Sequence, residues 1–174
     1  MIEKTWDAKR LTKIALAIAI VCVSTMAIQI PIPLGYMHLG NCCILLVSIY
    51  GDKTMGAMAG GLGSALADLL SGYPQWIIPT LIIKGTMGYA IAKIEKQEEK
   101  KASVSKARTL VAAIVGILIM VSGYTLFGAV LYGSMAAGIA QIPGLTTEGV
   151  LGIILFYVLG FAFERGKAFK VQQQ

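Results

Sequence analysis

The sequence predicts an all-α integral membrane protein with six transmembrane helices and both termini on the cytoplasmic side. Three observations carry this prediction: 56% of the residues are hydrophobic and 14% are charged, long apolar runs alternate with short breaks, and the basic residues gather in alternate breaks. A chain of 174 residues is expected to form one domain. A soluble domain of this size needs more polar surface, which argues against a soluble helical bundle.

Six apolar runs account for the predicted helices. The first, 11–30, has the roughly 20 residues that a helix needs to cross the hydrocarbon core. Its basic flank resembles a signal peptide, but further apolar segments follow, so an uncleaved first helix is expected. The prolines of "PIPLGYMHLG" then interrupt the helix. The remaining runs are 39–50, 54–70, 76–93, 109–132 and 145–163.

The breaks between these runs differ in length and polarity. "GDK" and "SGYPQ" are short, whereas "KIEKQEEKKASVSKAR" is a long aqueous linker. "GSMAAGIAQIPG" is a loop with room for a short helical turn, and "ERGKAFKVQQQ" is a polar tail.

The charge distribution sets the topology. Of the 15 Lys and Arg, four lie in the N-terminal segment, Lys53 lies in the second break, six lie in or beside the long linker, and three lie in the tail. The breaks at 31–38, 71–75 and 133–144 carry none. With six spans, every base except Lys84 falls on one side, which the positive-inside rule assigns to the cytoplasm. If 39–50 did not cross, bases would lie on both sides. The net charge of +6 does not indicate nucleic-acid binding, because the bases form no stripe.

Motifs for enzymatic chemistry are absent from the sequence. There is no GxxxxGK[ST] for ATP, no HExxH, no GxSxG and no Cys/His cluster. The three cysteines have neither metal nor redox spacing. The single histidine, His38, has no carboxylate beside it in sequence. We therefore expect a protein that is not an enzyme and holds no metal or cofactor of its own.

Lys84 is the one base outside the charge pattern. It lies eight residues into the fourth run, roughly 12 Å from the outer end. A charge at that depth costs at least a few kcal/mol unless it is paired or hydrated, and it is too deep to reach either surface easily. One interpretation is a structural ion pair with Asp68 in the third run. The other is a lysine that lines a pocket and contacts a ligand. The two are not exclusive.

Polar and aromatic residues gather on the same outer side as Lys84. Any one of the aromatics is explained as an anchor at the membrane interface. Together they offer apolar walls with a few donors and acceptors, as a small-molecule pocket requires, and aromatic rings suit a flat heteroaromatic ligand. The candidate residues are His38, Asn41, Tyr73, Gln75, Trp76, Lys84, Tyr124 and Glu148.

Small residues recur at spacing four in two runs. "GAMAGGLGSALAD" in the third run predicts a close helix crossing within the bundle. Ala15 and Ala19 in the first run form a similar pair, which could either pack inside the bundle or dock a partner. On pattern alone, packing inside the bundle is favoured for both.

Two stretches, "IPIPLGYMHLGN" and "GAMAGGLGSALADLLSGYPQWIIPTLIIKG", resemble the substrate-binding S component of energy-coupling factor (ECF) vitamin transporters. More narrowly, they are similar to the riboflavin-type S-component family, including its hydroxymethylpyrimidine/pyridoxine branch. The resemblance is dense over 31–85 and looser over the last two runs. It implies a six-helix, multi-pass protein of the bacterial cell membrane that binds a vitamin from outside.

The resemblance also implies partners and roles. Such a chain associates with a transmembrane coupling subunit and two cytoplasmic ATPase subunits, which bind the ATP. Ala15 and Ala19 match the family's AxxxA motif for the coupling subunit, which favours docking over packing. The family's pocket points to the first six candidate residues above, with Tyr124 and Glu148 as weaker members. The polar cluster suits hydroxymethylpyrimidine or pyridoxine. Riboflavin or another vitamin, a non-binding structural subunit, and a proton-coupled carrier acting alone remain alternatives.

Overall fold

The computed structural model describes residues 7–32, 35–95, 104 and 106–171, and these residues are mostly helical. Most of the predicted aqueous linker, residues 96–103 and 105, lies outside this range. The elements in chain order are α1 (Ala8–Ala27), β1 (Gln29–Ile32), β2 (Gly35–His38), α2 (Gly40–Tyr50), α3 (Lys53–Leu70), the short 3-10 helix η1 (Pro74–Trp76), α4 (Ile77–Glu95), α5 (Ala107–Leu131), α6 (Met135–Ala140) and α7 (Ile142–Val171).

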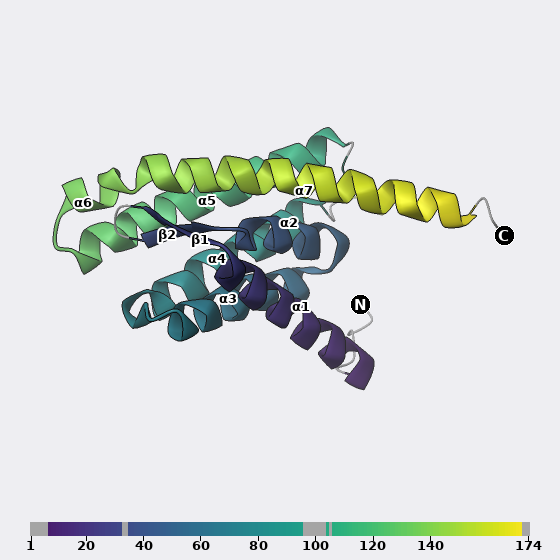
Figure 1. Cartoon of the computed structure of the whole chain (residues 1–174), viewed down its shortest axis with the longest axis horizontal. Helices are drawn as coiled ribbons and strands as arrows, with labels where there is room; N and C mark the ends of the chain where they lie inside the picture. Colours follow the sequence, from purple (N-terminus) through teal and green to yellow (C-terminus); the bar gives the residue numbers. More distant parts are fainter. Residues whose placement is uncertain (1–6, 33–34, 96–103, 105, 172–174) are drawn as a thin grey trace.

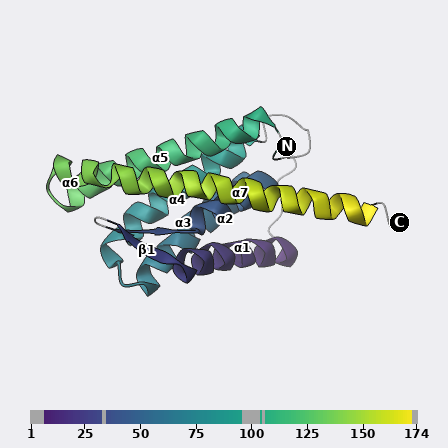
Figure 2. The same cartoon turned by 45° about the horizontal axis from the view of Figure 1, so that its top comes forward.

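The long helices run broadly along one axis (Figures 1 and 2), and in Figure 1 α1 is inclined to them. The start of α1 and the end of α7 lie toward the same end of the molecule, and α6 lies at the opposite end. Each of the six predicted runs contains a helix whose ends lie within three residues of the prediction, apart from the end of α7. That helix continues to Val171, past the predicted end at 163.

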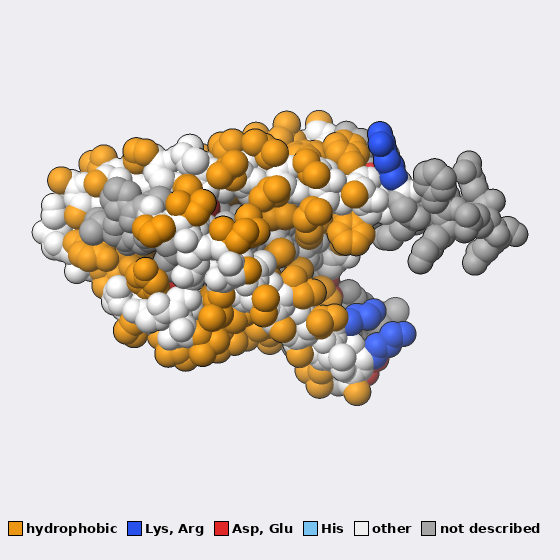
Figure 3. Space-filling view, viewed as in Figure 1, with side chains coloured by type: hydrophobic (Ala, Val, Ile, Leu, Met, Phe, Trp, Pro, Cys, Tyr) orange, Lys and Arg blue, Asp and Glu red, His pale blue; other side chains and the backbone are white. Residues whose placement is uncertain are grey.

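The surface is that of a protein surrounded by lipid. Among the described residues, four helical segments are long and apolar enough to cross a membrane: Ala8–Ala27, Pro74–Glu95, Ala107–Leu131 and Met135–Arg165. Large apolar side chains are exposed along them, including Val23, Ile78, Leu118 and Val130. On the face in Figure 3, hydrophobic side chains spread over most of the molecule, while the Lys and Arg side chains lie at one end. Such a distribution is typical of a multi-pass membrane protein.

A short β-hairpin lies between α1 and α2 in this otherwise helical fold, at a break that the sequence marks only as an interruption. Strands β1 and β2 pair antiparallel, from Gln29 opposite His38 to Ile32 opposite Gly35. Helix α1 ends at Ala27, before the predicted end at 30, because the next residue is already extended. Proline at position 31 cannot continue a helix, and the isoleucines that alternate along this segment favour a strand.

The hairpin explains why the second apolar helix is so short. Strand β2 leads directly into α2, which has 11 residues. At about 3.3 Å per strand residue and 1.5 Å per helix residue, β2 and α2 together span about 30 Å, the thickness of the hydrocarbon core. In Figure 1 the hairpin extends from the start of α2 toward the end that carries α6. The junction of β2 and α2 therefore lies in the middle of the molecule.

Small residues hold α3 tightly against α4, as the sequence predicted. A Cβ added at Gly88 would lie 2.1 Å from the carbonyl oxygen of Gly56, and one added at Gly60 would lie 2.5 Å from the carbonyl oxygen of Lys84. The backbones can approach this closely only because both helices lack side chains at the crossing. Gly60 thereby fixes the position of Lys84 on α4.

The small pair on α1 behaves differently. Ala17 is buried in the core, but Ala15 and Ala19 are exposed. The expectation from pattern alone, that this pair packs inside the bundle, is therefore wrong. The pair forms an outward face with little side-chain bulk.

Candidate functional site

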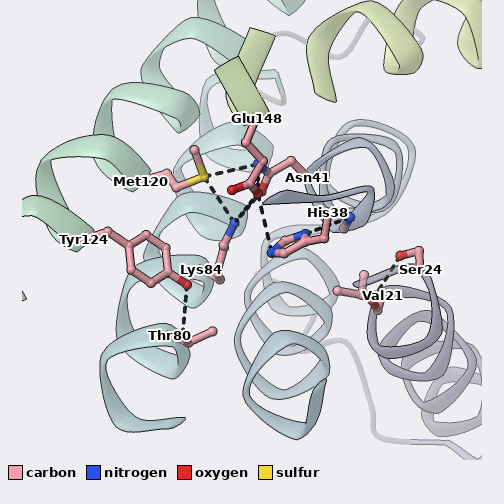
Figure 4. Close-up of polar contacts among 10 residues, drawn as sticks. Val21, Ser24, His38, Asn41, Thr80, Lys84, Met120, Tyr124 and Glu148 are labelled. Carbon is pink, nitrogen blue, oxygen red and sulfur yellow. Dashed lines mark hydrogen bonds and ion pairs between the residues drawn. The ribbon is translucent and has the colours of Figure 1, made fainter. Parts of the chain in front are cut away.

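Lys84 lies at the centre of a buried polar cluster (Figure 4). Its side chain is 1% exposed, and its ammonium group donates a hydrogen bond to Asn41 Oδ1. The Nζ atom also lies 3.1 Å from Met120 Sδ and forms an ion pair with Glu148 Oε1 at 3.6 Å. The lysine is thus paired on three sides by side chains from α2, α5 and α7.

Asn41 joins the members of this cluster. Its Nδ2 donates to Glu148 Oε1 at 2.6 Å and lies 3.2 Å from Met120 Sδ, while its Oδ1 accepts from Lys84. The asparagine is fully buried in the second position of α2. Tight packing holds it there, since a Cβ added at Gly152 of α7 would lie 2.8 Å from its own Cβ. Asn41 therefore fixes how α2, α4 and α7 meet.

His38 completes the cluster from the end of β2. Its Nδ1 accepts a hydrogen bond from the Gly40 N–H at 3.1 Å. In the neutral ring the proton is therefore on Nε2, which lies 3.5 Å from Glu148 Oε1. No carboxylate neighbours His38 in sequence, but the fold places one beside it from the far end of the chain.

Glu148 forms a close ion pair with Lys84. The Glu148 side chain is 3% exposed and lies within 4 Å of Lys84, Asn41 and His38. Asp68 is also buried, but it lies near the end of α3, where its backbone carbonyl accepts from the Tyr73 N–H. Asp68 also acts electrostatically on Lys84, although less strongly than Glu148. Helix α7 thus supplies the main counter-charge, and α3 supplies a second one.

An aromatic wall lies beside this cluster. The Trp76 ring packs against Tyr124 and Tyr132, with centroid separations of 5.5 and 6.2 Å. The Tyr124 hydroxyl bonds Thr80 Oγ1 at 2.8 Å, and Lys84 Nζ lies 5.5 Å from the Tyr124 ring centroid. A cation at that distance from an aromatic face is attracted to it. Tyr124 therefore connects the aromatic wall to the polar cluster.

The predicted candidates do not all meet. His38, Asn41, Lys84 and Glu148 are in contact, and Trp76 and Tyr124 form the wall beside them. Gln75 is exposed, and Tyr73 is half-buried in the turn before η1. The structure thus gathers six of the eight candidates.

Two contacts were missed from the sequence, those of Met120 and Thr80. Thr80 had a signal, because Trp76, Thr80 and Lys84 recur at spacing four and so share a face. Met120 had the same signal, because it precedes Tyr124 by four residues, but a methionine in an apolar run is usually a core residue.

The cluster can recognise a ligand through both charge and hydrogen bonds. It combines a cation, a carboxylate, an amide and an imidazole in an apolar setting, where such groups interact strongly. Within the described part of the chain, no group of three or more His, Cys, Asp or Glu could hold a metal ion. A polar ligand entering here would exchange contacts with a network that is already paired.

Comparison with known proteins gives two relatives. The chain is 37% identical over 147 residues to an uncharacterised protein of Pyrococcus woesei, covering 83% of this chain and 95% of that protein. It is 29% identical over 165 residues to the thiamine precursor transporter HmpT of Lactococcus lactis, covering 91% of this chain and 90% of that protein.

The model of a protein family matches nearly the whole chain. This family, described as the S component of the ECF-type riboflavin transporter, matches residues 5–165. The match confirms the resemblance that the two sequence stretches indicate and agrees with the apolar surface of the helices. The chain is a multi-pass membrane protein of vitamin uptake, and it belongs to the family of S components of ECF-type riboflavin transporters.

Proposed function

We propose that this chain is the substrate-binding subunit of an ECF-type importer that captures hydroxymethylpyrimidine or pyridoxine from outside the cell. The observation that carries the proposal is the buried cluster of Lys84, Asn41 and Glu148 beside the aromatic wall. A buried charged network is expensive to maintain and is an unusual feature of a membrane interior. A role in ligand recognition would explain why the protein has this buried charged network.

The chemistry of the cluster favours a small heteroaromatic ligand with hydroxyl groups. Lys84 and Asn41 supply donors, and Glu148 supplies an acceptor, so a hydroxymethyl group or ring nitrogen finds a partner of either kind. Tyr124 offers a face for a flat ring. The similarity to a thiamine precursor transporter supports this size of ligand. Riboflavin or another vitamin is the alternative substrate.

We further propose the orientation and the partners. The end of the molecule that holds the start of α1 and the end of α7 faces the cytoplasm, in agreement with the basic residues in these segments. Ala15 and Ala19 dock the transmembrane coupling subunit, because their exposed small side chains allow a partner helix to approach closely. Two cytoplasmic ATPase subunits bind ATP and drive import.

A non-binding structural subunit is the second candidate. It is favoured by the fact that Lys84 already has its counter-charge in Glu148 and its acceptor in Asn41. In that case the cluster holds helices together and meets no ligand.

Mass spectrometry of small molecules released from the purified protein separates the candidates. The proposal predicts a bound pyrimidine, pyridine or other vitamin, and calorimetric titration should then show tight binding of hydroxymethylpyrimidine or pyridoxine. The double variant Lys84→Met/Glu148→Gln removes both charges together, which often leaves stability nearly unchanged. It should remain folded and lose the ligand.

Three results would count against the proposal. No released compound together with no binding of hydroxymethylpyrimidine, pyridoxine or riboflavin would favour the structural subunit. Full affinity in the double variant would remove the cluster from the binding site. Uptake into liposomes by the chain alone, with no ATPase present, would indicate a carrier that acts by itself.

A further inference from the structure

Tyr124 and Gly128 lie on one face at the end of α5, and Tyr132, the residue that follows the helix, continues their spacing of four to form a short row. Trp76 packs against the first and last of these residues. The side chain of Gln141, between α6 and α7, lies over the middle one, since a Cβ added at Gly128 would be 1.9 Å from Gln141 Nε2. Trp76 and Gln141 thus flank the same short row on α5.

Both side chains carry a buried donor without an acceptor. Trp76 is 5% exposed and Gln141 is 4% exposed. Within the described residues, neither Trp76 Nε1 nor Gln141 Nε2 has a hydrogen-bond partner. Buried donors in native proteins are nearly always paired, and leaving one unpaired is costly. Two such donors on one row of α5 therefore need an explanation.

Their place in the fold suggests what pairs with them. Trp76 precedes Lys84 by two helical turns, and Tyr124 contacts both residues. Gln141 lies where α6 meets α7, toward the end of the molecule opposite the start of α1 (Figure 1). The two donors therefore lie on the outer side of the polar cluster, where a ligand from outside would approach Lys84 and Glu148.

We infer that the Trp76 and Gln141 N–H groups form a second contact for the ligand and donate hydrogen bonds to an acceptor atom on its outer edge. This inference rests on the proposed function and narrows the substrate class. The ligand is a flat ring whose inner edge meets Lys84 and Glu148 and whose outer edge carries a ring nitrogen, a hydroxyl oxygen or a carbonyl oxygen. A ring with an apolar outer edge would leave both donors unpaired and bind more weakly.

Two variants test the inference by removing one donor each. Gln141→Leu deletes the amide, and Trp76→Phe deletes the indole N–H while keeping an aromatic ring. The purified proteins are titrated with hydroxymethylpyrimidine, pyridoxine and riboflavin. For the probe that binds the wild type, each variant should raise Kd roughly tenfold, the effect of one lost hydrogen bond. Thr147→Val is the matched control, because its exposed hydroxyl already bonds the Pro143 carbonyl; its Kd should match that of the wild type.

Thermal unfolding without ligand separates ligand contact from a structural role. Because the Gln141 donor is unpaired in the free protein, Gln141→Leu should unfold at the wild-type temperature or above it. Gln141→Glu should weaken binding at least as much as Gln141→Leu, since a carboxylate repels an acceptor.

The outcomes distinguish the inference from the proposed function. Wild-type affinity in both Gln141→Leu and Trp76→Phe would overturn the second contact and leave the proposed function standing. A lower unfolding temperature of ligand-free Gln141→Leu, with unchanged affinity, would assign Gln141 to the fold. If the wild type binds none of the three probes, the proposed function fails, and this contact fails with it.

Discussion

The ion pair between Lys84 and Glu148 should hold the bundle together as well as meet a ligand. The variant Lys84→Met leaves the buried Glu148 carboxylate without its cation, and Glu148→Gln leaves the buried Lys84 ammonium without its anion. At the observed separation of 3.6 Å, an effective dielectric constant of about 20 gives an attraction of roughly 4.6 kcal/mol. Breaking buried pairs of this kind typically costs about 3–5 kcal/mol. Each single variant should therefore be strongly destabilised.

The assay is thermal unfolding of detergent-purified protein in a double-mutant cycle. For a chain of this length, 1 kcal/mol corresponds to about 2–4 °C, so each single variant should unfold roughly 10 °C below the wild type. The double variant should recover most of that loss, because the new amide can still bond Asn41. The reasoning is refuted if the two single losses simply add, or if either single variant unfolds like the wild type.

The remaining predictions concern two helix surfaces. Gly88→Ala should lower the free energy of unfolding by about 1–3 kcal/mol, because its Cβ would overlap the Gly56 carbonyl. Gly85→Ala should be tolerated, since its Cβ would meet nothing closer than 3.5 Å. Thermal unfolding compares the two variants, and equal stability would contradict the close crossing of α3 and α4. Ala19→Trp should abolish co-purification with the coupling and ATPase subunits without changing vitamin affinity. The control is Val111→Trp, which places the same bulk on an exposed site of α5. If Ala19→Trp co-purifies with the partner subunits as well as Val111→Trp does, α1 is not the docking surface.

The helices could be predicted from the sequence because lipid imposes a simple rule. A crossing segment must be long, apolar and free of charge, so basic residues and prolines mark its ends. The hairpin could not be predicted, because "PIPLGYMHLG" contains prolines and glycines that are typical of a loop. The strands form because Gln29 pairs with His38 across the hairpin, and this pairing cannot be deduced from either segment alone.

The site was partly predictable for a similar reason. Lys84 stood out because an ionisable residue inside an apolar run is rare. Its pairing with Glu148 could not be assigned, because it joins α4 to α7, two segments far apart in the chain, and so depends on the tertiary fold. The spacing of four between Thr80 and Lys84 would have added Thr80 to the candidates. The unpaired donor of Gln141 had no signal in the sequence.

The start of α2 in the middle of the molecule has an electrostatic consequence. The first N–H groups of a helix have no acceptor within it, and together they act as roughly half a positive charge. One of these groups, the Gly40 N–H, donates to His38 Nδ1, and Asn41, the second residue of the helix, bonds the Glu148 carboxylate through its side-chain amide. An uninterrupted helix would present no free N–H at this depth. The break therefore places a partial positive charge beside the cluster that contains Glu148.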